Sequence, residues 1–304
     1  MNENLMKKFE REVTKDKIDS CLIQHDGKTV FEYYRNNKMK ERQHKIYSVT
    51  KSILSILVGI AIDKGYIPHV HTPITAYFPD SRKDSAGDEI TIKHLLTMTS
   101  GLHWPGNTAM IPSKNWVKFV LSQPVEYKPG EERVYSCGSS QLISAILQKA
   151  TGLDTVSFAQ KHLFMPLGIT QYKWNRDSQG IAIGGFGLNM KTEDLLKIGM
   201  LYMNNGQWKS KQIVPSDWVK ESTAASVKIN NTFSYGYHWW VLTGDDQEFP
   251  IPETFFALGK NGQYIFVVPS YKLTAVFTSD ITDDSSRPIE YFKKYLLANA
   301  CIKS

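Results

Sequence analysis

The alternation of apolar and polar residues predicts β-strands near both ends of the chain, with helices between them. Residues 21–25 and 29–34 alternate like the two strands of a hairpin, and Asp26 and Gly27 between them form a turn signal. Further strand-like runs follow after residue 232, and they cover residues 235–242, 254–258, 263–268 and 272–278. The pattern therefore predicts an α/β sheet assembled from both termini.

Between these strands, apolar residues recur at the spacing of helices. The most apolar run, residues 48–64, is expected to be a buried helix that ends at Gly65. Other helices are predicted over residues 91–98, 139–151, 156–164, 191–204, from about 215, and 287–298. We expect one domain of residues 1–304, in which residues 66–189 form a mostly helical lobe. This lobe is inserted into an α/β lobe made of residues 1–65 and 190–304.

The composition is that of an ordinary soluble globular protein, with 41% hydrophobic and 22% charged residues in a chain of 304. The net charge of +6 is mild, and basic and acidic residues are interleaved, so we expect no nucleic-acid partner. No apolar run reaches the roughly 18 residues of a membrane span. The first ten residues lack the apolar region of a signal peptide. The sequence predicts a cytoplasmic protein, or an extracytoplasmic one if an export signal was removed.

Neither cysteines nor histidines indicate a disulfide framework or a metal centre. The three cysteines are too few and too dispersed for such a framework, and they are Cys21, Cys137 and Cys301. Four histidines raise the question of a metal site, namely His69, His71, His94 and His103. No carboxylate cluster or cysteine stands at ligand spacing around them. We predict surface or packing histidines, and neither a metal nor a cofactor.

Ser48 stands three residues before Lys51, at the mouth of the predicted apolar helix. Residues i and i+3 lie on the same face of a helix, so the serine hydroxyl and the lysine amine could meet at hydrogen-bond distance. A serine hydroxyl becomes a good nucleophile when a neighbouring base takes its proton. A helix N-cap serine followed by a solvated lysine gives the same string, so this pair alone does not establish a catalytic site.

Two further strings fit this pair. Tyr135-Ser136-Cys137 falls in a turn before a predicted helix, and Gly259-Lys260-Asn261-Gly262-Gln263-Tyr264 opens a strand. With the Ser-x-x-Lys step, their order and separation resemble the serine β-lactamase and penicillin-binding-protein superfamily over roughly residues 20–295. The likeness is closest to the class C-type branch, which includes esterases, D-amino peptidases and amidases of the 6-aminohexanoate-dimer type. It implies a serine-β-lactamase-like fold, with an antiparallel sheet flanked by helices and an inserted helical lobe.

The resemblance implies a role for each matching residue. Ser48 would be the acylated nucleophile, and Lys51 would be either its proton acceptor or the cation that keeps Tyr135 acidic. Tyr135 would carry the proton to the leaving group and later activate the deacylating water. A phenol with an unperturbed pKa of about 10 needs cations beside it for this work, and Lys260 is a second candidate after Lys51.

The oxyanion hole would consist of two backbone N–H groups, those of Ser48 and Gln263. Gly262 would let the substrate approach the strand closely. Lys260 keeps the cation that could bind a substrate carboxylate.

Two positions depart from the family pattern. Cys137 stands where the second motif usually has an asparagine, whose amide binds the acylamide of lactams and peptides. A thiol is only a weak donor and a weak acceptor. Asn261 stands where β-lactamases have a threonine or a serine, so a hydroxyl is missing. Both changes favour an esterase or a specialised amidase over a β-lactamase.

We therefore predict a serine hydrolase that forms an acyl-enzyme on Ser48 and cleaves a small ester, a small amide or a short peptide. One alternative is a D-amino-acid peptidase or D,D-carboxypeptidase, favoured if Lys260 binds a terminal carboxylate, or a weak β-lactamase. Another is a non-catalytic acyl-binding or penicillin-sensing protein, against which the intact Ser48, Lys51 and Tyr135 argue. The sequence does not define the oligomeric state.

Overall fold

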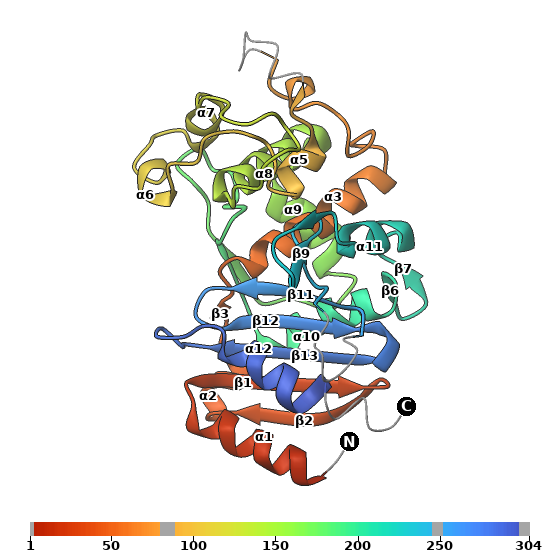
Figure 1. Ribbon diagram of the computed structural model, residues 1–304. Helices are drawn as coiled ribbons and strands as arrows, with labels where there is room; N and C mark the ends of the chain where they lie inside the picture. Colours follow the sequence, from red (N-terminus) through yellow and green to blue (C-terminus); the bar gives the residue numbers. More distant parts are fainter. Residues whose placement is uncertain (1–2, 80–88, 245–251, 298–304) are drawn as a thin grey trace.

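The structure, a computed structural model, describes residues 3–79, 89–244 and 252–297. An eight-stranded antiparallel sheet forms the lower part of the molecule in Figure 1. Its strands follow one another in this order: β2 (Lys28–Tyr34), β1 (Ile18–His25), β13 (Leu273–Ser279), β12 (Gln263–Val268), β11 (Thr254–Gly259), β10 (Trp240–Leu242), β9 (Phe233–Tyr235) and β8 (Val227–Lys228). The prediction of a sheet built from both termini is confirmed.

Helices cover both faces of this sheet and create two apolar cores. On one face, α10 (Thr192–Met203) packs against β1, β12 and β13. On the other face, α1 (Glu3–Lys15) packs against β1 and against the last helical turns, η4 (Phe292–Leu297). β12 and β13 lie in the middle of the sheet and are covered on both sides, so they are buried along their whole length.

The helix α3 (Val49–Asp63) lies at the centre of the larger core. Every residue from Val49 to Ala61 is buried, which explains why the run is apolar on all sides. The helix packs against α8 (Cys137–Thr151) and against β11. The predicted helix over residues 48–64 is therefore confirmed, and its first turn is brought beside the sheet.

The remaining elements are short, and α5 to α8 gather in the upper part of Figure 1. The other helical segments are α2 (Asn37–Glu41), η1 (Ile74–Ala76), α5 (Ile92–Leu96), α6 (Asn107–Met110), α7 (Trp116–Leu121), α9 (Thr155–Ala159), η2 (Gln160–Phe164), α11 (Ser216–Thr223), η3 (Pro269–Tyr271) and α12 (Arg287–Tyr291). There are also two small sheets. One has three strands in the order β3 (His44–Lys45), β5 (Leu188–Met190) and β4 (Tyr172–Trp174), and the other pairs β6 (Gln207–Trp208) with β7 (Lys211–Gln212). The predicted helices are all present, with ends shifted by a few residues. The predicted end of the last helix, Ala298, lies outside the described residues.

The single strand predicted over residues 235–242 is wrong. The structure instead has two strands, β9 and β10, which pair antiparallel with each other on either side of a turn. Distant backbone groups hold this turn: the N–H of Tyr237 donates to the carbonyl of Ser222 at 2.8 Å, and that of His238 to the carbonyl of Leu96 at 3.0 Å. Apolar periodicity carries no signal for such non-local hydrogen bonds.

The helix α1 is absent from the sequence prediction. Of its residues, only Phe9 and Val13 are buried, so its apolar stripe is too narrow to stand out from sequence alone. Among the described helices, none combines the length and the apolar character needed to cross a membrane. Cys21 and Cys137 are buried and free, while Cys301 lies outside the described residues.

Candidate active site

A cavity of about 360 Å³ lies where the start of α3 meets the end of β11. Its wall is made of Ser48, Arg133, Tyr135, Trp240, Leu258, Gly259, Lys260 and Ser285. The cavity thus brings together one residue from each predicted motif, namely Ser48, Tyr135 and Lys260. Among the described residues that line it, two are cations and none carries a carboxylate.

The backbone before α3 fixes the position of Ser48. Tyr47 adopts a φ of 47°, an uncommon value for a residue with a side chain. The Thr50 hydroxyl holds this turn by donating to the Tyr47 carbonyl at 2.6 Å. A side chain on Gly259 would meet the carbonyl oxygen of Ile46 at 2.3 Å. Glycine at this position therefore lets the end of β11 approach the loop that carries the serine.

The Lys51 amine connects the residues of the site. Lys51 is 1% exposed, and its Nζ donates to Ser48 Oγ at 3.1 Å, to Cys137 Sγ at 3.3 Å and to the Gly185 carbonyl at 2.7 Å. The same nitrogen lies 4.7 Å from the centre of the Tyr135 ring. The contact between serine and lysine that the helical spacing predicts is present.

The surroundings of Lys51 favour its charged form. Burial by itself lowers the pKa of the amine, whereas Tyr135 and Cys137 beside it raise that pKa, and the net value lies above the ordinary one. The amine is therefore protonated at neutral pH. A protonated lysine cannot accept the proton of Ser48, so of its two predicted roles the cationic one fits the site better.

The start of α8 brings Cys137 into the site. Ser136 caps this helix by accepting the N–H of Ser139 at 3.2 Å, and Cys137 follows as its first residue. The thiol is 8% exposed and contacts Lys51. The residue that departs from the resembled pattern therefore contacts the lysine that also contacts Ser48.

Gln263 and Gly262 of the third motif are not among the residues that line this cavity, and the roles predicted for them stay predictions. Gln263 is 1% exposed, and its side-chain amide donates to the carbonyl of Ser279 at 2.6 Å. The carbonyl of Gly262 accepts the Ser279 hydroxyl at 2.8 Å. Gln263 is the first residue of β12, and its side chain is engaged with β13. The backbone beside Ser48 is that of Gly259 and Lys260.

The two remaining residues of this turn differ in exposure. Asn261 is 8% exposed, and its amide donates to Asp280 at 3.2 Å, so this amide is engaged away from the cavity. Lys260 is exposed at the rim. Of the third motif, only the lysine offers a charged group to a substrate.

His238 packs against the first turn of α3, next to Lys51, and the sequence analysis gave it no role. Its Nδ1 donates to the carbonyl of Lys51 at 3.1 Å, and its own carbonyl accepts the hydroxyl of Ser52 at 2.7 Å. Burial, and then the charge on Lys51, lower the pKa of His238 to about 3. This histidine is therefore neutral at neutral pH and ties the turn between β9 and β10 to α3.

The low pKa of His238 predicts acid sensitivity of the fold. An unfolded histidine takes up a proton below its ordinary pKa of 6.5, while folded His238 stays neutral down to about 3. The free energy of unfolding should therefore fall with falling pH in this window, by up to about 1.4 kcal/mol per pH unit. Urea denaturation between pH 7 and pH 4.5 measures the slope. His238→Asn should flatten it and the exposed control His69→Asn should not; equal slopes in all three proteins would contradict the prediction.

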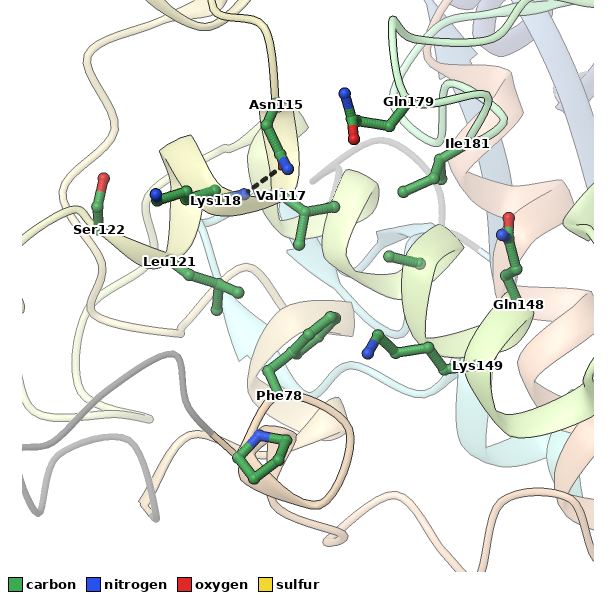
Figure 2. Close-up of a pocket in the computed structure, with 12 residues that line it drawn as sticks. Phe78, Asn115, Val117, Lys118, Leu121, Ser122, Gln148, Lys149, Gln179 and Ile181 are labelled. Atoms are coloured by element: carbon green, nitrogen blue, oxygen red, sulfur yellow. Dashed lines mark hydrogen bonds between the residues drawn. The ribbon is translucent and has the colours of Figure 1, made fainter.

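A second cavity lies between α7 and α8, away from the three motifs. It measures about 510 Å³, and Figure 2 shows Lys149 reaching toward Phe78 at its centre. None of the motif residues lines it. Among the described residues, no group of three or more histidine, cysteine, aspartate or glutamate side chains could hold a metal ion. His94 caps α5, and His103 pairs with Glu126 at 2.8 Å.

Comparison with known proteins identifies the family. The β-lactamase family model matches residues 18–298, so the chain belongs to the β-lactamase family of hydrolases, within the serine β-lactamase and penicillin-binding-protein superfamily. The 6-aminohexanoate-dimer hydrolase of Paenarthrobacter ureafaciens is 21% identical over 299 residues, which are 88% of this chain and 74% of that protein.

Two solved structures share the fold. EstCE1, a hydrolase with promiscuous acyltransferase activity, has a TM-score of 0.79 at 16% identity, covering 96% of this chain and 98% of that chain. A class C β-lactamase in complex with cefoxitin has a TM-score of 0.78 at 18% identity, covering 97% of this chain and 98% of that chain. The predicted serine-β-lactamase-like fold is confirmed.

Proposed function

We propose that the protein is a serine hydrolase that forms an acyl-enzyme on Ser48 and cleaves a small ester or amide. The observation that carries this proposal is the 3.1 Å contact between Ser48 Oγ and Lys51 Nζ, in a cavity that Tyr135 also lines. A nucleophile, a cation and a phenol that can hold a proton are the three groups that acyl transfer to a serine needs.

The charge on Lys51 suggests how the proton moves. The ammonium group, 4.7 Å from the Tyr135 ring centre, stabilises the phenolate form of Tyr135. The phenolate takes the proton of Ser48 as Oγ attacks the substrate carbonyl, and it then gives this proton to the leaving group. A water molecule, activated by the same phenolate, attacks the acyl-enzyme, and the proton returns to Ser48 as the acid leaves.

The oxyanion needs two N–H donors beside Ser48. The first is the N–H of Ser48 itself, at the positive end of α3. For the second we propose an N–H near Gly259 rather than that of Gln263. β10 pairs with β11 only as far as Phe256, so the following edge of β11 has no strand beside it among the described residues and borders the cavity.

The cavity wall favours a small apolar acyl group. Trp240 and Leu258 provide apolar surface, and the volume of about 360 Å³ limits the size of the acyl group. We therefore expect measurable turnover of p-nitrophenyl acetate or butyrate. A comparison with the matching anilide, a D-alanyl-D-alanine peptide and a penicillin tests the proposal, and the absence of any turnover would oppose it.

Lys260 supports the second candidate, a D-amino-acid peptidase or carboxypeptidase. Its amine is exposed at the rim of the cavity, where it could pair with the terminal carboxylate of a peptide. Lys260→Met separates the two functions. It should raise KM for a substrate with a free carboxylate and leave KM for a neutral ester unchanged.

Cys137 predicts a preference for esters over lactams. Its thiol contacts Lys51 and cannot supply the amide that orients the side chain of a lactam. Cys137→Asn should raise the ratio of lactam acylation to ester turnover on the order of tenfold, the effect of one hydrogen bond of ~1.4 kcal/mol. Cys137→Ser, which restores no amide, is the matched control. Efficient lactam hydrolysis by the wild type, or an unchanged ratio in Cys137→Asn, would count against this prediction.

A further inference from the structure

Arg133 belongs to the cavity wall but to none of the three motifs. Three aromatic rings surround its guanidinium carbon, at 4.6 Å from the ring centre of Tyr235, 5.1 Å from Trp240 and 5.5 Å from Tyr135. A guanidinium within about 6 Å of an aromatic face is attracted by the ring. The position of Arg133 is therefore fixed by the side chains that it touches.

Among the described residues, no carboxylate pairs with the charge of Arg133. Its Nε and Nη2 atoms are buried and have no hydrogen-bond partner among the described residues. A partly buried cation without an anionic partner is costly, and aromatic faces compensate only in part. Such an arrangement is expected at a functional site, where the negative partner forms during the reaction.

Two cations lie near the ring of Tyr135. Lys51 Nζ is 4.7 Å from the ring centre and the Arg133 guanidinium is 5.5 Å from it. The other titratable groups around it are Cys137, Lys260 and Tyr235. Burial, and then the charge on Tyr135, raise the pKa of Tyr235 well above its ordinary value, so Tyr235 remains neutral.

We propose that Arg133 is a positioning residue of the acyl transfer, which holds Tyr135 against Lys51 and stabilises its phenolate. The phenolate accepts the Ser48 proton as the bond from Oγ to the substrate carbonyl forms. The neutral phenol returns that proton to the leaving group as the bond to this group breaks. Arg133 and Lys51 keep their protons throughout. This inference rests on the function proposed above.

The pH dependence of ester hydrolysis tests this role. In Arg133→Met, kcat for p-nitrophenyl butyrate should fall about 10- to 100-fold, because a charge at this distance is removed. The acid limb of the kcat profile should move to higher pH, since the phenolate loses a stabilising charge. KM should change less than kcat, because Arg133 acts through Tyr135. In Arg133→Lys the acid limb should stay close to its wild-type pH, because lysine keeps the positive charge.

Lys149→Met is the matched control, because Lys149 Nζ lies 5.3 Å from the centre of the Phe78 ring in the second cavity (Figure 2). It removes a cation from an aromatic face far from the three motifs, and it should leave the pH profile unchanged. The thermal midpoints of all variants are measured in parallel. A lower midpoint in Arg133→Met together with a shifted acid limb would still support the proposal.

Three results would overturn the role of Arg133. The first is an unchanged acid limb in Arg133→Met, whatever happens to kcat. The second is a rise in KM alone, which would make Arg133 a substrate contact. The third is an equal shift in Arg133→Met and Arg133→Lys. Labelling of Ser48 by a fluorophosphonate in the wild type separates these failures from a failure of the proposed function, since an unlabelled wild type would oppose that function itself.

Discussion

Ser48→Ala is expected to abolish the turnover of p-nitrophenyl butyrate. Ser48 Oγ is the proposed nucleophile because it contacts Lys51 at 3.1 Å and lines the cavity, and alanine has no oxygen to acylate. Loss of a nucleophile that acts together with its partners costs at least ~10⁴-fold in rate. Steady-state kinetics at neutral pH, with circular dichroism to verify the fold, measures the effect.

Ser55→Ala is the matched control for this variant. Ser55 lies on the same helix, is fully buried, and its hydroxyl has no hydrogen-bond partner among the described residues. We expect this variant to retain the wild-type rate. Substantial turnover by a folded Ser48→Ala protein would contradict the assignment of the nucleophile.

Lys51→Ala and Tyr135→Phe should each lower kcat by at least ~10²-fold, the usual scale of general acid–base catalysis. The first variant removes the cation beside the phenol, and the second removes the hydroxyl that is proposed to move the proton. Since both act in one proton transfer, the double variant should be little slower than either single variant. The three rates form a double-mutant cycle, with Tyr202→Phe as a control at a buried tyrosine away from the cavity.

Small losses of kcat that are additive in the double variant would indicate that Lys51 and Tyr135 have structural roles instead. Lys51→Ala creates a buried void next to Cys137 and Gly185, so its thermal midpoint must be measured as well. Tyr135→Phe keeps the ring and changes only the hydroxyl. If the two single variants give different results, the result for Tyr135→Phe therefore carries more weight.

The part of the site that depends on local geometry could be predicted from the sequence. The spacing of Ser48 and Lys51 within one helix determines their contact, and the structure has it. The positions of Arg133 and His238 could not be predicted in this way. Arg133 depends on the rings of Tyr235 and Trp240, which flank a turn that the sequence analysis assigned to a continuous strand.

The position of Gln263 also depends on contacts between distant parts of the chain, which local sequence patterns do not predict. The string from Gly259 onward indicates a turn and a strand, and both are present. Which side of the turn faces Ser48 depends on how closely β11 approaches the loop before α3, and the carbonyl of Ile46 sets that approach. Strand periodicity predicts the hairpin but not the edge that meets the helix.

Intact-protein mass spectrometry tests the acyl-enzyme most directly. The protein is incubated with p-nitrophenyl butyrate and quenched in acid, and a fluorophosphonate serves as a parallel irreversible label. We predict a mass increase of one butyryl or one phosphonyl group, which peptide mapping locates on Ser48 and which is missing from Ser48→Ala. An adduct on any other residue, or no adduct with either reagent, would contradict the account.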